Sequence, residues 1–124
     1  MPTLDMYGPY ALTSAQIDRV VRRISAGNYA LGYVNDEDKF IVQYVGRSDG
    51  DLCAELKGRL GAKYSRFKFS YAESPRAAFD KECHNFHDFG GSESLDNEIH
   101  PARPKGTLWP CPVCSALGNG NVRR

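Results

Sequence analysis

The sequence predicts an α/β (α+β) fold in which helices flank a small three-stranded antiparallel sheet. Two β-type runs separated by a polar loop, a third run of alternating apolar residues, and helical apolar spacing around them all favour this class. The chain has 124 residues, of which 41% are hydrophobic, including 6 Phe, 7 Tyr and 1 Trp. This length and composition suit one domain with its own core.

The predicted strands follow from local pattern. Residues 29–34 and 40–45 are rich in β-branched and aromatic side chains, and a five-residue polar loop, 35–39, separates them. Such a short loop cannot make a parallel crossover, so these two strands must be antiparallel. Apolar and polar residues alternate over 67–71, which predicts a third strand with one buried face.

Three helices are expected around these strands. The first starts with a capping box at Thr13 and is ended by Gly27. Ser48 and Asp49 can cap the second, and Ser74-Pro75 begins a third that runs to about residue 89.

The chain divides by pattern into four segments. Residues 1–26 are an N-terminal lead-in, irregular over 1–12, and a helix packed on the domain. Residues 27–97 form the central domain, 98–117 a Cys- and His-containing cap, and 118–124 a flexible tail.

Charge and hydropathy exclude several classes of protein. The net charge of +1 argues against a strongly basic protein that coats DNA. No apolar run approaches the roughly 20 residues that span a bilayer, and residues 1–10 lack a signal-peptide pattern. We therefore expect a cytoplasmic protein with no membrane partner.

Glu82 stands out in the third predicted helix. It shares a helix face with Phe79 and Phe86, and a carboxylate there is costly to bury unless a cation pairs with it. Taken alone, Glu82 is interpreted as a residue at the edge of the core whose carboxylate pairs with a Lys or Arg.

Four features in sequence order make a larger pattern. Gly27-Asn28-Tyr29, Tyr44-Val45-Gly46, the helical Glu82 and the downstream Asn97 together resemble the GIY-YIG nuclease family. The resemblance covers roughly residues 27–97, and the order of strands and helices is also similar.

The resemblance implies a divalent-metal-dependent endonuclease that hydrolyses phosphodiester bonds of a nucleic acid; DNA is the favoured substrate, and the choice between DNA and RNA stays open. Glu82 would hold one Mg²⁺ or Mn²⁺ ion, and Tyr29 and Tyr44 would line the site, one of them orienting or deprotonating the attacking water. Asn97 would support the metal site or the loop around it.

One position departs from the family. Glu55 stands where the family carries a helix Arg that neutralises phosphate. Arg47 or Arg59 could supply that charge instead. The alternative is a nuclease-like nucleic-acid-binding module with weakened catalysis.

A basic segment follows the second predicted helix. It is free of acidic residues between Leu56 and Ala72, and it predicts a phosphate-contacting stripe. A solvated strand edge would carry the same pattern. The stripe residues are Lys57, Lys63, Tyr64, Arg66 and Lys68.

The cysteines suggest a second metal site. Cys111 and Cys114 form a C-x₂-C pair, and Cys83 and His87 share a helix face, so together they could bind a structural Zn²⁺. His100 is the rival fourth ligand. Buried reduced thiols or a redox pair would explain the same cysteines. If the basic residues are scattered, a zinc-stabilised protein-interaction module becomes a further alternative.

No separate recognition domain is visible in 124 residues. We therefore expect low sequence preference, or recognition supplied by a homodimer.

Overall fold

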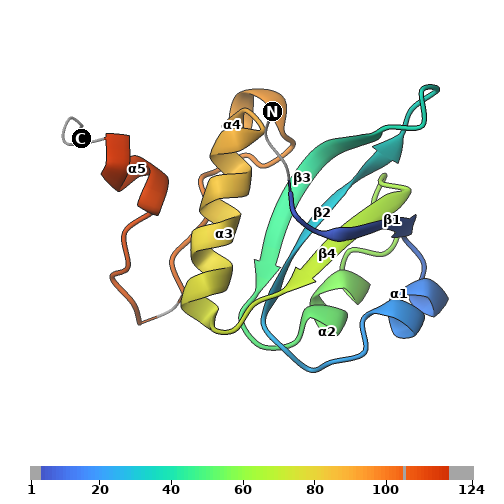
Figure 1. Cartoon of the computed structure of the whole chain (residues 1–124), viewed down its shortest axis with the longest axis horizontal. Coiled ribbons are helices and arrows are strands. Elements are labelled where there is room, and N and C mark those ends of the chain that lie inside the picture. The colour runs from blue at the N-terminus through green and yellow to red at the C-terminus, as the bar shows by residue number, and fades with distance from the viewer. Residues whose placement is uncertain (1–3, 105, 118–124) are drawn as a thin grey trace.

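The computed structural model describes residues 4–104 and 106–117, and the predicted tail at 118–124 lies outside this range. The fold is α+β (Figure 1). Its elements, in order, are β1 (Tyr7–Ala11), α1 (Ser14–Val20), β2 (Gly27–Val34), β3 (Phe40–Ser48), α2 (Leu52–Lys57), β4 (Arg66–Tyr71), α3 (Pro75–Asp88), α4 (Gly91–Ser94) and α5 (Pro112–Leu117).

The sheet is antiparallel and has four strands in the order β1-β4-β2-β3. The predicted hairpin is confirmed: β2 pairs with β3, and the Asn35 amide donates to the Lys39 carbonyl across the loop at 2.9 Å. β2 also pairs with β4, so it lies in the interior of the sheet. In the β2–β3 register Tyr29 faces Gly46.

The expectation of three strands, with an irregular segment at residues 1–12, was wrong. β1 pairs with β4 at the sheet edge, with Tyr7 opposite Phe69 and Ala11 opposite Arg66. Gly8 and Pro9 argue against a strand at this position in the sequence, because Pro donates no hydrogen bond to a neighbouring strand and Gly weakens strands. The register shifts between Tyr7 and Tyr10, and this irregularity at an edge accommodates both residues.

Two helices differ from their predicted limits. Thr13 caps α1 as expected, but the helix ends at Val20, and Ile24 is 88% exposed instead of completing an apolar face. After α1 the backbone finds other partners, since the Ser25 carbonyl accepts from the Leu52 amide at 3.0 Å. Asp51, rather than Ser48 or Asp49, caps α2 by accepting from the Ala54 amide.

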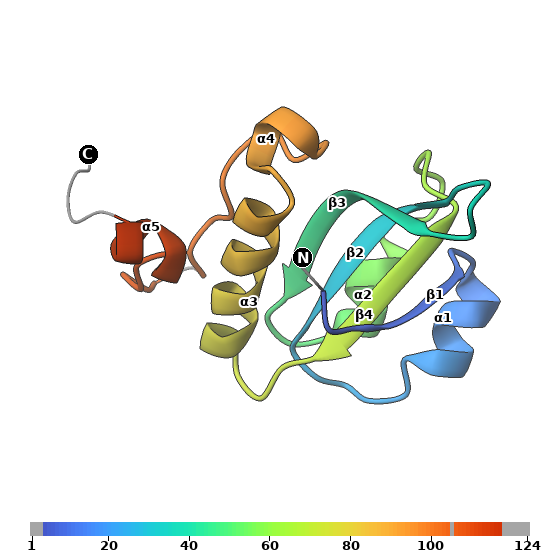
Figure 2. The ribbon, with the colours of Figure 1, turned by 45° about the horizontal axis from the view of Figure 1, so that its top comes forward.

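The two faces of the sheet carry separate cores. α1 and α2 cover one face, where Ile17 and Leu56 pack with Tyr29 and Phe67. α3 covers the other face, where Ala30 is part of a second cluster. α5 lies on the side of α3 away from the sheet, as Figures 1 and 2 both show.

α3 is capped at Ser74, as predicted, and has Pro75 at its first position. Cys83 on its outer side packs with Cys111 of the C-terminal segment. Among the described residues, no helix is long and apolar enough to cross a membrane.

Candidate functional site

A polar cleft of about 310 Å³ opens where β2 and β3 approach α2 and α3. Its position follows from the sheet, because it lies beside the free edge of β3 near that strand's end. It is lined by Tyr29, Tyr44, Gly46, Arg47, Ser48, Asp49, Glu55, Arg59, Glu82 and Ala102. The cleft thus gathers the two tyrosines, the helix carboxylate and both candidate arginines that sequence analysis selected.

Tyr29 is fully buried beneath the cleft. Its hydroxyl donates to Glu55 Oε2 at 2.8 Å and accepts from Arg59 Nε at 2.9 Å. Burial raises the pKa of Tyr29 above its ordinary value, and the nearby Glu55 carboxylate raises it further. The phenol is therefore neutral at physiological pH, and it holds Glu55 and Arg59 in fixed positions.

Gly46 makes this arrangement of Tyr29 possible. A Cβ atom built at Gly46 would lie 2.4 Å from the Tyr29 hydroxyl oxygen and 2.3 Å from the adjacent ring carbon. Any larger residue at position 46 would displace the ring. The glycine of the Tyr44-Val45-Gly46 motif thus has a steric purpose that comes from its cross-strand partner.

Arg59 joins the two tyrosines. Its Nη2 donates to the Tyr44 hydroxyl at 3.2 Å and lies 3.3 Å from Glu55 Oε2, while its guanidinium lies 4.9 Å from the centre of the Tyr44 ring. The Tyr29 and Tyr44 rings stack with centres 6.4 Å apart. Glu55 is therefore paired with a cation and does not present an isolated negative charge to the cleft.

Glu82 projects from α3 into the other side of the cleft and is 8% exposed. Burial raises the pKa of its carboxyl, while the Arg47 guanidinium, which donates to Oε1 at 2.5 Å, lowers it. Arg47 also donates to Asp49 through Nε at 2.8 Å. The cleft therefore contains three cation–carboxylate pairs. Arg59 pairs with Glu55 of α2, and Arg47 of β3 pairs with both Glu82 of α3 and Asp49.

Asn97 does not line the cleft. Its Oδ1 accepts from the Val45 amide at 3.0 Å, and its Nδ2 donates to the Val45 carbonyl at 2.8 Å. It therefore contacts the free edge of β3 and anchors the segment that follows α4. These bonds agree with its expected support of the loop around the site, and its expected part in catalysis stays a prediction.

The predicted basic stripe does not form one surface. Lys57 pairs with Asp18 at 2.6 Å, and Lys63 pairs with Asp96 at 3.0 Å. Tyr64 also donates to Asp96, at 2.8 Å. On β4 the pleat places Arg66 and Lys68 on the sheet face opposite Phe67 and Phe69, and so away from α2.

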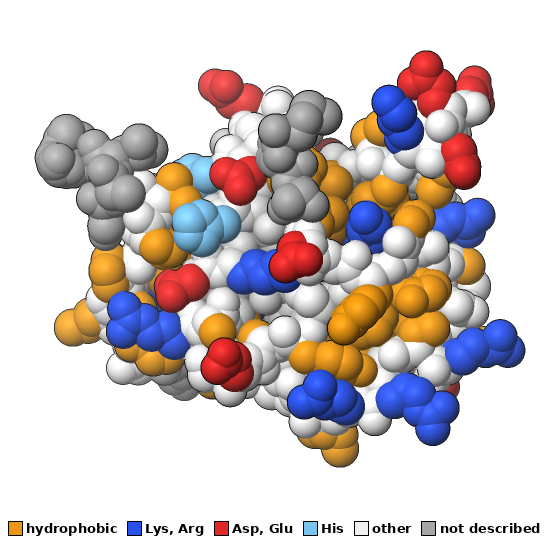
Figure 3. All heavy atoms as spheres, viewed as in Figure 1, with side chains coloured by type: hydrophobic (Ala, Val, Ile, Leu, Met, Phe, Trp, Pro, Cys, Tyr) orange, Lys and Arg blue, Asp and Glu red, His pale blue; other side chains and the backbone are white. Residues whose placement is uncertain are grey.

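Figure 3 shows the face of the molecule seen in Figure 1, where several Lys and Arg side chains stand apart around the right and lower right of the view, with apolar and uncharged groups between them.

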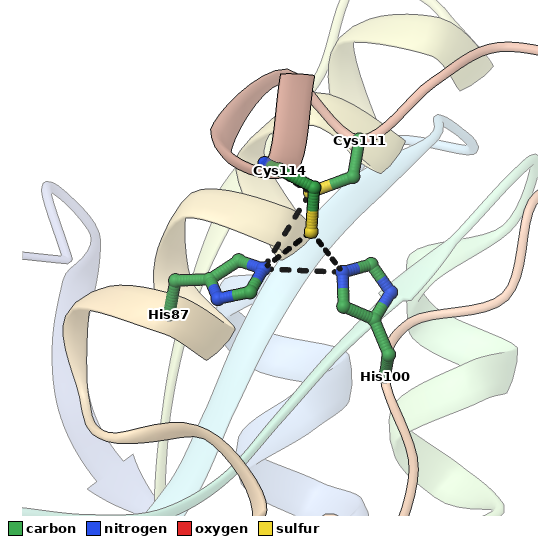
Figure 4. Close-up of side chains that lie close together, drawn as sticks. All are labelled: His87, His100, Cys111 and Cys114. Atoms are coloured by element: carbon green, nitrogen blue, oxygen red, sulfur yellow. Dashed lines mark hydrogen bonds between the residues drawn. The ribbon is translucent and has the colours of Figure 1, made fainter. Parts of the chain in front are cut away.

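A second cluster lies at the outer side of α3. His87, His100, Cys111 and Cys114 place one ligand atom each within 4.8 Å of one another, and they could hold a metal ion such as zinc (Figure 4). The two His Nε2 atoms are 3.1 Å apart, and Cys114 Sγ lies 3.5 Å and 3.6 Å from them. Tetrahedral bonds of about 2.0–2.3 Å would separate ligand atoms by roughly 3.3–3.8 Å, so the group suits zinc.

The surroundings of these ligands also suit a metal. The His100 Nδ1 lies 3.0 Å from the Pro101 carbonyl, which can only accept, so Nδ1 carries the proton and Nε2 is free to bind. The Cys114 amide donates to Cys111 Sγ at 3.5 Å. Burial, and then the neighbouring His100, lower the pKa of His87 and favour its neutral form.

The rival ligand His100, rather than Cys83, completes this group. Cys83 is fully buried next to Cys111 in a small apolar cluster with Phe79. Burial and the contact with Cys111 both raise the pKa of the Cys83 thiol, which keeps it protonated. The i, i+4 spacing of Cys83 and His87 was a misleading signal, because Cys83 is directed toward the inner side of the cap.

Sequence reasoning missed some cleft residues. Its sequence position predicts that Asp49 is a helix cap, whereas its carboxylate pairs with Arg47. Ala102 carries no chemical signal at all and lines the cleft only because the segment between His100 and Cys111 returns beside it.

Comparison of the chain with protein-family models, with curated proteins and with solved structures found no match.

Proposed function

We propose that this protein is a divalent-metal-dependent endonuclease of the GIY-YIG type that hydrolyses phosphodiester bonds, most suitably in DNA. The observation that carries the proposal is the convergence of Tyr29, Tyr44 and Glu82 on one polar cleft with two arginines. These residues come from β2, β3, α3 and the turn that follows α2, and the resemblance selects the three that are central to the proposal.

Glu82 is the residue that would hold a Mg²⁺ or Mn²⁺ ion. Hard cations bind carboxylate oxygens and keep several waters, and a bound ion would supply Lewis acidity and a water of lowered pKa. The Glu82 carboxylate is nearly buried and already neutralised by a cation, Arg47, so an ion would compete with this guanidinium. Arg47, released from Glu82 and still paired with Asp49 through Nε, could then contact a phosphate oxygen with its other N–H groups.

Glu55 is the best-placed proton acceptor. Its side chain is 34% exposed, whereas Tyr29 is fully buried and neutral. Tyr29 and Arg59 both bond Glu55 Oε2 and so orient the carboxylate. We assign Glu55 to accept the proton of the attacking water. Tyr29 positions the Glu55 carboxylate, and Arg59 neutralises phosphate charge.

We further propose that His87, His100, Cys111 and Cys114 bind a structural Zn²⁺. The segment that supplies three of these ligands has few other anchors, and metal binding would provide the ordering energy.

Cleavage of supercoiled plasmid tests the catalytic proposal. Wild-type protein with Mg²⁺ or Mn²⁺ should nick the plasmid, and Glu82→Ala should lower the rate by about 100-fold or more while its circular dichroism spectrum stays unchanged. Glu93→Ala, which removes an exposed carboxylate of α4, is the matched control and should leave the rate unaltered. Intact plasmid and oligonucleotides over a wide range of protein and metal concentrations would refute the proposal.

The second candidate is a nucleic-acid-binding module that no longer cleaves. The closed Arg47–Glu82 ion pair favours it, because this pair neutralises the carboxylate that would hold the metal ion. Position 55 separates the two candidates. If Glu55 is the proton acceptor, both Glu55→Gln and Glu55→Arg should lose activity. If Glu55 only replaces a lost arginine, Glu55→Arg should gain activity instead.

A further inference from the structure

A second cavity, of about 450 Å³, lies at the other edge of the sheet from the cleft. It is bounded by the N-terminal segment that leads into β1, by the end of β4 and by α3, which Figure 2 shows around the same corner of the molecule. We call it the Lys81 cavity. The lining residues that carry the argument are Asp5, Tyr7, Arg23, Ser70, Tyr71 and Lys81.

Lys81 brings a positive charge to this cavity. Its ammonium donates to Ser70 Oγ at 2.9 Å and to the Asp5 carbonyl at 3.0 Å, and both of these acceptors are neutral. An ammonium has three N–H donors, so one remains for a ligand. Partial burial lowers the pKa of Lys81, and the negative charge of Asp5 opposes this shift only in part.

Arg23 adds a second cation in a fixed orientation. Its guanidinium lies 4.6 Å from the centre of the Tyr71 ring. The Tyr71 hydroxyl accepts from the Arg22 amide at 2.9 Å, which holds the ring in place. A guanidinium stacked on a ring keeps its edge donors available for oxygen ligands such as phosphate.

Tyr7 supplies an exposed aromatic surface at the same cavity. It is 61% exposed, although one side of its ring packs against Phe69 with centres 5.5 Å apart. A supported but open ring of this kind is suited to stacking against a nucleobase.

We propose that the Lys81 cavity binds a nucleotide, with its phosphate at Lys81 and Arg23 and its base on Tyr7. The Asp5 carboxylate at the lining leaves a net charge of +1, which suits a single phosphate better than a triphosphate. The nucleotide can be free or part of a strand, because the recognised chemistry is the same. This inference goes beyond the proposed cleavage and does not depend on it.

Titration of the whole ¹⁵N-labelled protein with 5′-AMP and with a short oligo-dA, followed by two-dimensional NMR, tests the proposal. Amide signals of Tyr7, Ser70, Tyr71 and Lys81 should shift with either ligand. Stronger binding of AMP identifies a free nucleotide, and stronger binding of oligo-dA identifies a strand. Adenosine and ribose 5-phosphate are the comparison ligands, and each should bind at least about tenfold more weakly than AMP because it lacks one of the two contacts.

Variants assign the contacts. Arg23→Gln and Tyr7→Ala change exposed residues and should each weaken AMP binding by roughly tenfold. Lys39→Gln removes an equal charge from the exposed hairpin loop and should change nothing. Lys81→Gln should weaken binding similarly, and Arg23→Gln keeps the test valid if that variant does not fold.

The proposal is overturned if no shift occurs at these residues up to about 5 mM ligand, or if adenosine or ribose 5-phosphate binds as well as AMP. Plasmid cleavage measured on the same variants separates the two proposals. Loss of AMP binding with unchanged cleavage would concern the Lys81 cavity alone, and absent cleavage with intact AMP binding would concern the cleft alone.

Discussion

The sheet and the C-terminal segment of this protein are held in place by different means. β2 is paired along both sides, so backbone hydrogen bonds fix the residues of the cleft that it carries. Between α4 and α5 the described residues form no helix or strand, and they depend on a few side-chain anchors. Asn97 and the His/Cys group are two of these anchors, and Asp96 adds contacts with Lys63 and Tyr64.

The walls of the cleft are therefore held in place in two different ways. Tyr29, Tyr44 and Arg47 lie on paired strands, whereas Ala102 belongs to the anchored segment, two residues beyond His100. The catalytic geometry should therefore survive a loss of metal from the His/Cys group better than the shape of the cleft does. The following predictions test this separation, from the largest expected effect to the smallest.

Removal of a metal ligand should have the largest effect. We expect wild-type protein to bind about one Zn²⁺ per chain and Cys114→Ser to bind none tightly, because a tetrahedral site requires all four ligands. Hydrogen exchange over residues 97–111 should then become fast, while exchange in β2 and β4 stays slow. Cys53→Ser removes a thiol outside the group and serves as the control. Slow exchange over 97–111 in zinc-free protein would contradict the separation.

Gly46→Ala should have the second-largest effect among these changes. The added methyl overlaps the Tyr29 ring, and such overpacking costs about 1–3 kcal/mol of unfolding free energy, measurable with urea. The displaced ring should also release Glu55 and lower cleavage. At Gly50 nothing lies within 4 Å of a built Cβ, so Gly50→Ala is the matched control. Equal stability of the two variants would show that Tyr29 is not held as described.

Asn97→Ala removes the connection between the two regions. Both bonds to the Val45 backbone are lost, and we expect a decrease of about 1–2 kcal/mol in unfolding free energy. Exchange at the Val45 amide should also accelerate. The exposed neighbour Glu98, changed to Ala, should leave both quantities unaltered.

Glu82→Gln should change how stability depends on pH. The pKa of Glu82 is raised above its ordinary value near 4.5, so its favourable contribution is complete below that pH and is lost as pH rises through the folded pKa. Wild type should therefore gain melting temperature relative to Glu82→Gln as pH falls from 7 to 4.5, by a few degrees at most. A gap that stays constant over this range would mean that burial does not penalise this carboxylate.

The smallest effect is expected at an exposed ion pair on the surface. Lys63 is well exposed in its ion pair with Asp96, and Lys63→Gln should change the unfolding free energy by no more than about 0.5 kcal/mol. A larger loss, measured by urea unfolding, would mean that this pair helps to hold the segment that follows α4.

Local sequence signals predicted most of the sheet and its helices, since Thr13 and Ser74 are caps and alternation marks β4. They failed at β1, where Pro9 and Gly8 contradict a strand that exists through its pairing with β4. They also failed for Glu55, because its partners Tyr29 and Arg59 become its neighbours only in the folded chain. His100 was only the rival ligand, since no periodicity fixes a residue between two irregular stretches.

The bonds of Asn97 to Val45 have a consequence for self-association. A side-chain amide here occupies the donor and the acceptor that another strand would use. A strand of a second molecule could not pair with β3 at this point to form a continuous intermolecular sheet. If this chain forms a dimer, the contact must avoid the edge of β3 at Val45. The opening of the cleft beside Gly46 then stays accessible to a long polymer.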